Sequence, residues 1–170
     1  MSKLRLRLIY KEARQRLHDA KRLDKEGGLV DLSDSAYLLR LLSLELLLKC
    51  IYEAVLEKKP GRHHAYEELF RDLPVEFQNK LLALTGERIG PSGLSQDPTS
   101  ILQEWGKNFI NLRYPYEKYE GLSEEEYLSI GKQWIAKGAQ EEEATFRYFP
   151  NELNGFLHAL DYIAKEMVNH

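Results

Sequence analysis

The sequence predicts an all-α protein, an up-and-down helical bundle of about five main helices with an irregular acidic insert near residues 118–150. Apolar residues recur with helical spacing through most of the chain, and no stretch shows sustained strand-like alternation. Residues 35–57 are apolar on almost every side, which is typical of a helix in the middle of a bundle. The last apolar residues follow the helical repeat closely, at Leu153, Phe156, Leu157, Leu160, Ile163, Ala164 and Met167.

The composition is that of an ordinary globular protein, with 170 residues, 43% of them apolar and 30% charged. A chain of this length is expected to form a single domain over residues 1–170. Cys50 is the only cysteine, which excludes an intrachain disulfide and fits a reducing cytosol. Apolar runs stop short of the roughly 20 residues that a membrane span needs, and no signal-peptide core is present. We therefore expect a cytoplasmic protein without membrane association.

Positive charge is concentrated at the start of the chain, where residues 1–25 carry nine Lys or Arg against three acidic residues. A basic helix over residues 1–26 could contact nucleic acid. The sequence pI of about 6.0 favours a different interpretation. On this interpretation, the helix has a solvated face that complements the acidic remainder, within the chain or across a dimer.

Local signals set the elements of the first half. A helix is predicted over about residues 3–25, and Gly27-Gly28 ends it. Ser33 or Asp34 is a suitable cap for the central helix, and the Lys58-Lys59-Pro60-Gly61 sequence stops it. Two shorter helices follow, over residues 65–72 and 75–85.

The second half begins with residues 90–98, which are rich in turn formers and are expected to form a mobile loop. Thr99 or Ser100 opens the next helix, which Pro115 ends or kinks at Tyr114. Further signals predict a capping box at Ser123 and Glu126, a helix end at Gly138, a short strand over residues 145–149, and a final helix capped by Asn151.

The central helix carries charge on one narrow line, because Glu45, Lys49 and Glu53 recur every fourth residue. An isolated buried charge is very costly, so these groups must be paired or must face a polar cleft. We expect this helix to be the most buried element, and truncating one of its leucines to alanine to cost about 2–5 kcal/mol. The residues expected to be inaccessible are Leu39, Leu42, Leu46 and Cys50.

The common catalytic and cofactor motifs are missing. The sequence contains no GxxxxGK[ST], GxGxxG, HExxH or GxSxG motif, and no cysteine pair. His63 and His64 adjoin Glu67 and Glu68, but adjacent histidines on a helix point in different directions. A surface or capping role is favoured over metal ligation, and we expect no metal and no cofactor.

Three segments in order resemble the HEPN superfamily of helical bundle proteins. They are LLSLELLLK at 41–49, HAYEELFRDLP at 64–74, and NLRY at 111–114 followed by Tyr116 and Glu117. The resemblance covers roughly residues 30–120 and the last helix. It implies a helical bundle that pairs as a homodimer.

Many HEPN proteins are metal-independent ribonucleases, whose signature is an arginine followed four to six residues later by a histidine. The resemblance places Arg113 at the arginine position, where a guanidinium would stabilise charge on a phosphate. The window after it holds Glu117, Lys118 and Tyr119 and no histidine. We therefore expect no ribonuclease activity.

Arg113 then has three interpretations. The favoured one is a structural ion pair with Glu45 or Glu117, and the second is contact with a phosphate or nucleotide. The third is catalysis with His63 or His64 supplied from elsewhere in the chain. Nearby tyrosines could stack on a base, although in most bundles such tyrosines cover the core.

The sequence thus suggests a binding or partner module. Its predicted ligand cleft consists of Glu45, Lys49, Arg113, Tyr116 and Glu117, with a nucleotide, an RNA end or a cognate protein as ligand. The alternatives are a ribonuclease, as the toxin of a toxin–antitoxin or phage-defence system, and a purely structural protein-interaction module. A second copy is the expected partner, and a cognate nucleotidyltransferase or antitoxin protein is also compatible with the resemblance.

Overall fold

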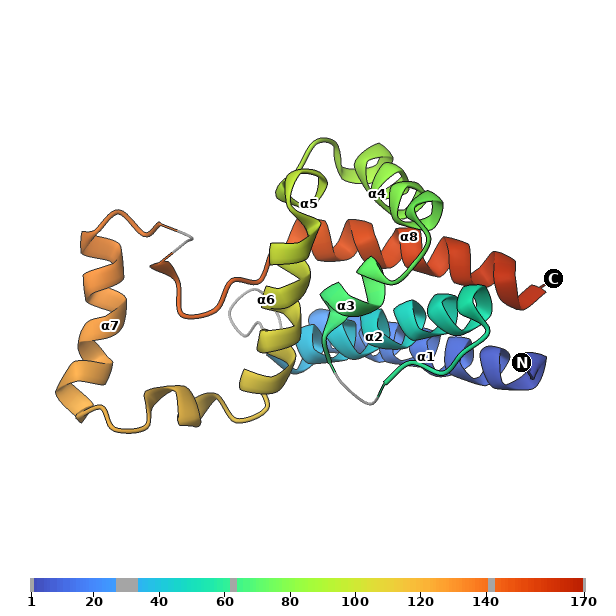
Figure 1. Cartoon of the computed structure of the whole chain (residues 1–170). Coiled ribbons are helices and arrows are strands. Elements are labelled where there is room, and N and C mark those ends of the chain that lie inside the picture. Colours follow the sequence, from blue (N-terminus) through green and yellow to red (C-terminus); the bar gives the residue numbers. More distant parts are fainter. Residues whose placement is uncertain (1, 27–33, 62–63, 141–142, 170) are drawn as a thin grey trace.

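The computed structural model describes residues 2–26, 34–61, 64–140 and 143–169 (Figure 1). In these ranges it contains eight α-helices, one 3-10 helix and no strand, which confirms the all-α prediction. Gly27-Gly28 and Ser33, which were expected to end one helix and cap the next, lie outside the described residues, as does His63.

The first two long helices form a closely packed antiparallel pair. Helix α1 spans Lys3–Glu26 and α2 spans Asp34–Leu56. The pair approaches closely because α1 places small side chains in the interface, and Ala13 and Ala20 are fully buried. The hydroxyl of Ser43, also fully buried, donates to the backbone carbonyl of Ala13 at 2.9 Å. The small side chain of Ala13, and the hydrogen bond from the Ser43 hydroxyl to its carbonyl, thus determine how close α1 and α2 lie.

Helix α2 lies at the centre of the core, but the sequence prediction of its buried face was partly wrong. Leu39, Leu42 and Leu46 are only partly buried, whereas Cys50 is inaccessible as expected. The pattern could not set the rotation of α2 because leucines occupy nearly all of its sides. The packing of neighbouring helices decides it, and buries Leu41, Leu44, Leu47, Leu48 and Ile51 completely.

The middle of the chain folds as four helices on one side of α2. They are α3 (Tyr66–Arg71), α4 (Val75–Ile89), α5 (Gly93–Gln96) and α6 (Pro98–Asn111). Helix α4 extends one turn beyond the predicted end, to Ile89, and Gly90 is its C-cap.

The prediction of a loop at residues 90–98 is wrong, because this stretch contains α5 and the start of α6. Leu94 anchors this stretch with a fully buried side chain. Asp97, rather than Thr99 or Ser100, caps α6, and its carboxylate accepts a hydrogen bond from the backbone N–H of Ser100 at 3.0 Å.

Residues 115–140 and 143–149 form an arm that extends away from the bundle. It contains the 3-10 helix η1 (Pro115–Tyr119) and α7 (Glu124–Ala136), which stands apart from the other helices in Figure 1. Ser123 and Glu126 form the predicted capping box, and Gly138, with φ of 93°, follows the end of the helix. Helix α7 contains no buried residue.

The returning segment of the arm was predicted as a strand over residues 145–149, and this prediction was wrong. The segment is irregular because its backbone carbonyls bond to side chains of α6 instead of to a second strand. Trp105 Nε1 donates to the carbonyl of Tyr148 at 3.2 Å, and Asn108 Nδ2 donates to that of Arg147 at 2.7 Å. These bonds fix the base of the arm to the bundle.

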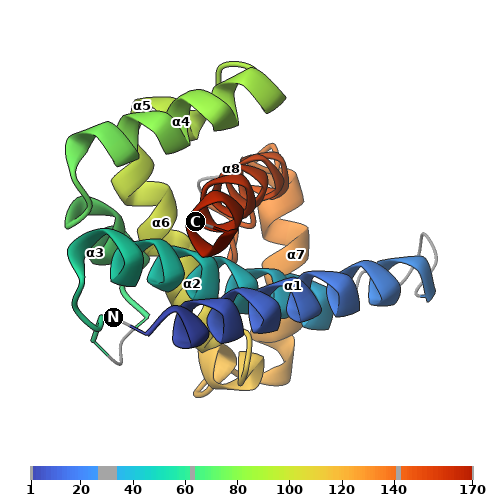
Figure 2. The ribbon, with the colours of Figure 1, turned by 90° about the vertical axis from the view of Figure 1, so that its right-hand side faces the viewer.

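The last helix, α8 (Pro150–Asn169), lies between α4 and the α1–α2 pair (Figure 2). It begins one residue before the predicted cap at Asn151. Helices α4 and α8 come close at Gly155, where an added Cβ would lie 2.9 Å from Ile89 Cγ2. Within the described ranges, no helix combines the length and apolarity that crossing a bilayer requires.

Candidate functional site

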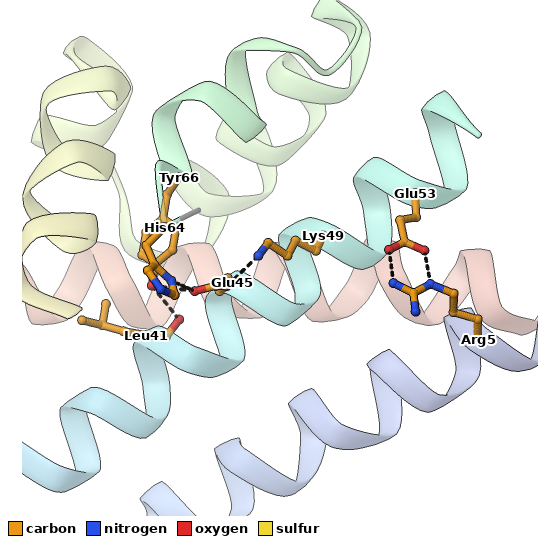
Figure 3. Close-up of polar contacts among 7 residues, drawn as sticks. All are labelled: Arg5, Leu41, Glu45, Lys49, Glu53, His64 and Tyr66. Carbon is orange, nitrogen blue, oxygen red and sulfur yellow. Dashed lines mark hydrogen bonds and ion pairs between the residues drawn. The ribbon is translucent and has the colours of Figure 1, made fainter. Parts of the chain in front are cut away.

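Glu45 is a buried carboxylate near the middle of α2, with 6% of its surface exposed. Lys49 Nζ donates to Glu45 Oε1 at 2.7 Å, and His64 Nδ1 lies 2.7 Å from Oε2 (Figure 3). The Tyr66 hydroxyl lies 3.4 Å from both Oε2 and the carbonyl of Leu41. Two cationic or imidazole groups and a phenol therefore compensate the buried charge.

The same environment acts on Tyr66, which is completely buried. Burial and the neighbouring Glu45 carboxylate raise the pKa of the Tyr66 hydroxyl. The phenol therefore stays protonated and acts as a donor toward the carboxylate.

Glu53, the other acidic residue of the charged line, is compensated from α1. Arg5 donates to both of its carboxylate oxygens at 2.7 Å (Figure 3). The Glu53 side chain is 1% exposed. Its hydrogen bonds to Arg5 raise the pKa of the guanidinium. The prediction that the charged line must be paired is confirmed, and one basic residue of the N-terminal helix serves the acidic remainder of the chain.

His64 reaches Glu45 because the chain passes very close to α6 at Gly106. A Cβ on Gly106 would lie 2.6 Å from the His64 carbonyl oxygen, so only glycine fits there without displacement. The imidazole then stacks at a tilt on Phe109, with ring centroids 4.7 Å apart. Because a carboxylate only accepts hydrogen bonds, Nδ1–H is the donor of this bond.

Arg113 packs on the same aromatic ring. Its guanidinium carbon lies 5.1 Å from the Phe109 centroid, and the side chain is exposed. The predicted ion pair with Glu45 or Glu117 is wrong, because neither carboxylate lies within ion-pair distance. Helix α6 ends at Asn111, so Arg113 leaves the helix before it could reach α2, and Glu45 already has Lys49 and His64 as partners.

The other two predicted cleft residues lie on η1. Tyr116 and Glu117 are exposed, and Tyr116 packs edge-on against Tyr114 at 6.3 Å. Neither has a hydrogen bond or ion pair with Glu45 or Lys49. The structure thus joins Glu45 and Lys49 directly, connects Arg113 to their neighbour His64 through Phe109, and leaves Tyr116 and Glu117 outside this network.

Three residues of the network lacked a role in the sequence prediction: Tyr66, Gly106 and Phe109. Only Tyr66 had a signal, since it lies within the HAYEELFRDLP segment. His64 had been considered as a surface cap or as a distant catalytic partner, and its contact with Glu45 had no local signal. Over the part of the chain that the structure describes, no group of three His, Cys, Asp or Glu side chains is placed to hold a metal.

We call Glu45, Lys49, His64, Tyr66, Phe109 and Arg113 the Glu45 cluster. It combines an imidazole oriented by a carboxylate with an exposed guanidinium on a shared aromatic ring. Such groups can donate to a phosphate and can stack against a ring. Comparison with protein-family models, curated proteins and solved structures finds no match for this chain.

Proposed function

We propose that this chain is a HEPN-like, non-catalytic module that binds a nucleotide or an RNA end at the Glu45 cluster. One observation carries the proposal: His64 and Arg113, distant in sequence, both pack on Phe109. The guanidinium is exposed and has no carboxylate partner among the described residues, so it is available for a phosphate. Tyr116 and Glu117, the other two residues of the predicted cleft, lie outside this network and are not part of the proposed site.

Binding of a fluorescent adenine nucleotide and of a labelled short RNA, followed by anisotropy, tests the proposal. Arg113→Gln should weaken binding about 10-fold or more, because a charge-assisted contact to phosphate is lost. Lys107→Gln is the matched control, since it removes an exposed charge from α6, the helix that carries Phe109, and should change affinity less than about twofold. Equal loss in both variants, or no binding by the wild type, would contradict the proposal.

The contact of His64 and Arg113 with one ring also supports a ribonuclease as the second candidate, in the manner of a toxin or phage-defence nuclease. Here the histidine would come from before α3 instead of from the window after Arg113. An imidazole oriented by Glu45 is a suitable general base or acid. The lack of the family's signature histidine favours the non-catalytic function.

Incubating the protein with single-stranded and structured RNA, with and without chelator, distinguishes the two candidates. We expect no cleavage. Chelator-resistant cleavage that disappears in both Arg113→Ala and His64→Ala, with helicity unchanged by circular dichroism, would establish the ribonuclease instead.

We further propose a homodimer in which α7 contacts the second copy. Tyr127, Leu128 and Ile135 are between 51% and 69% exposed, which leaves an apolar face on a helix that contains no fully buried residue. The first turn of α7 contains Glu124, Glu125 and Glu126. Helix α1 offers a complementary surface, since it is basic and exposes Leu4 and Leu8.

A further inference from the structure

A hollow separate from the Glu45 cluster lies where α1, α2, α4 and α8 meet. Its volume is about 360 Å³, within the range that accommodates small molecules. Its lining contains four cationic side chains and a single carboxylate, together with an amide, an imidazole and two leucines. The lining residues are Arg14, Leu17, Lys21, Arg40, Arg88, Asn154, Leu157, His158 and Asp161.

Helical spacing brings these groups together. Arg14, Leu17 and Lys21 are three and four residues apart on α1, so they lie on one face of that helix. The same spacing places Leu157 and Asp161 on the facing side of α8. Arg40 of α2 and Arg88, near the end of α4, complete the wall. This basic site could not be recognised from the sequence, because its cations come from three different helices.

The carboxylates near the hollow neutralise only part of this charge. Arg14 Nη1 pairs with Asp161 Oδ2 at 2.6 Å, and Arg40 pairs with Asp24. No carboxylate of the described residues lies within ion-pair distance of Lys21 or Arg88. An excess of positive charge therefore remains in the hollow, although the protein as a whole has a net charge of −3.

A second hollow of about 510 Å³ adjoins the first and shares Arg88 and His158 with it. Its other lining residues are Leu84, Glu87 and Tyr162, so it offers an aromatic and an aliphatic wall. Tyr162 is 48% exposed, and Lys80 Nζ lies 5.9 Å from its ring centroid. The carboxylate of Glu87 would repel an anion in the second hollow. The anionic part of a ligand is therefore expected in the first hollow, and an aromatic or aliphatic ring in the second.

We infer that these two hollows bind a small organic phosphate, with the phosphate among Lys21, Arg88, Arg14 and Arg40 and its ring beside Tyr162. Guanidinium groups form paired hydrogen bonds with phosphate oxygens, and four cations from three helices can surround one phosphate. This site is independent of the function proposed for the Glu45 cluster.

Phenyl phosphate and inorganic phosphate, titrated by isothermal calorimetry into the 170-residue chain, test the inference. The double variant Lys21→Gln/Arg88→Gln should weaken phenyl phosphate binding about 10-fold or more. Arg14 and Arg40 are left in place, because removing either would strand its carboxylate partner. The charge-matched control Lys107→Gln/Lys132→Gln, exposed positions on α6 and α7, should retain affinity within about twofold.

Two further variants complete the test. Tyr162→Ala should weaken phenyl phosphate and leave inorganic phosphate unchanged, and an unchanged affinity for phenyl phosphate would overturn the placement of the ring. Arg113→Gln should change neither affinity, which separates this site from the Glu45 cluster. No binding of phenyl phosphate by the wild type, or equal losses in the double variant and its control, would overturn the site itself.

Discussion

His64 Nδ1 lies 2.7 Å from Glu45 Oε2, a contact between residues 19 apart that fixes the loop before α3 to the centre of α2. Lys49 binds the other oxygen of the same carboxylate. The Glu45 side chain is 8% exposed, so solvent cannot replace these partners. Glu45 therefore couples the position of His64 to the stability of the bundle.

Glu45→Gln should lower the free energy of unfolding by about 1–3 kcal/mol, because Lys49 and His64 lose a charged acceptor in a mostly buried place. Urea denaturation at neutral pH measures the change. Glu117→Gln is the control, because Glu117 is exposed on η1, and its effect should be close to zero. Similar values for the two variants would show that Glu45 contributes no more than a surface carboxylate.

Gly106→Ala should displace the His64 backbone, since the new Cβ would meet the His64 carbonyl oxygen at 2.6 Å. We expect a loss of about 1–3 kcal/mol in unfolding free energy and a changed NMR shift for the His64 ring as it leaves Phe109. Gly86→Ala, in α4 with no atom within 4 Å of the added Cβ, should instead stabilise by about 0.5–1 kcal/mol. Unchanged stability and His64 shift in Gly106→Ala would refute the close approach.

Stability should fall as pH rises from 9 toward 12. Burial raises the pKa of the Cys50 thiol from its ordinary value of 9.0 to about 12, and it raises that of Tyr10 from 10.0 to about 12. The unfolded chain loses these protons first, so stability is complete below pH 9 and is lost as pH approaches 12. Urea titrations at pH 8, 9, 10 and 11 should show a shallower decline for Cys50→Ala, and equal slopes would contradict the assignment.

The arm provides a prediction about assembly. Wild-type protein should show twice its chain mass of 19.8 kDa by light scattering, and Leu128→Glu/Ile135→Glu should show one chain mass. The two substitutions are seven residues apart, on the same side of α7, and place charge on the exposed apolar face. Gln133→Glu adds a charge on another side of the helix and should remain dimeric. A monomeric wild type would contradict the proposed dimer.

The long helices were largely predictable from the sequence, because they depend on short-range chemistry. The first helix, the central helix and the final helix were predicted within about two residues of their observed bounds. Ser123 and Glu126 also formed their capping box as expected, since its partners are three residues apart. Predictions were wrong where contacts with residues distant in sequence had a larger effect than local turn-forming residues. The expected loop at residues 90–98 contains α5, for example, because the Leu94 side chain is buried in the core.

Apolar residues on nearly every side of α2 were enough to predict its central place, and the cost of an unpaired charge in a core predicted that its charged line needs partners. The sequence could not identify those partners. Only the tertiary structure brought Arg5 to Glu53 and His64 to Glu45, and turned Arg113 onto Phe109. Periodicity in a sequence predicts which segments form helices and which of their residues are apolar. The rotation of each helix and the close approach of two segments, as between Gly106 and His64, depend instead on the packing of the whole core.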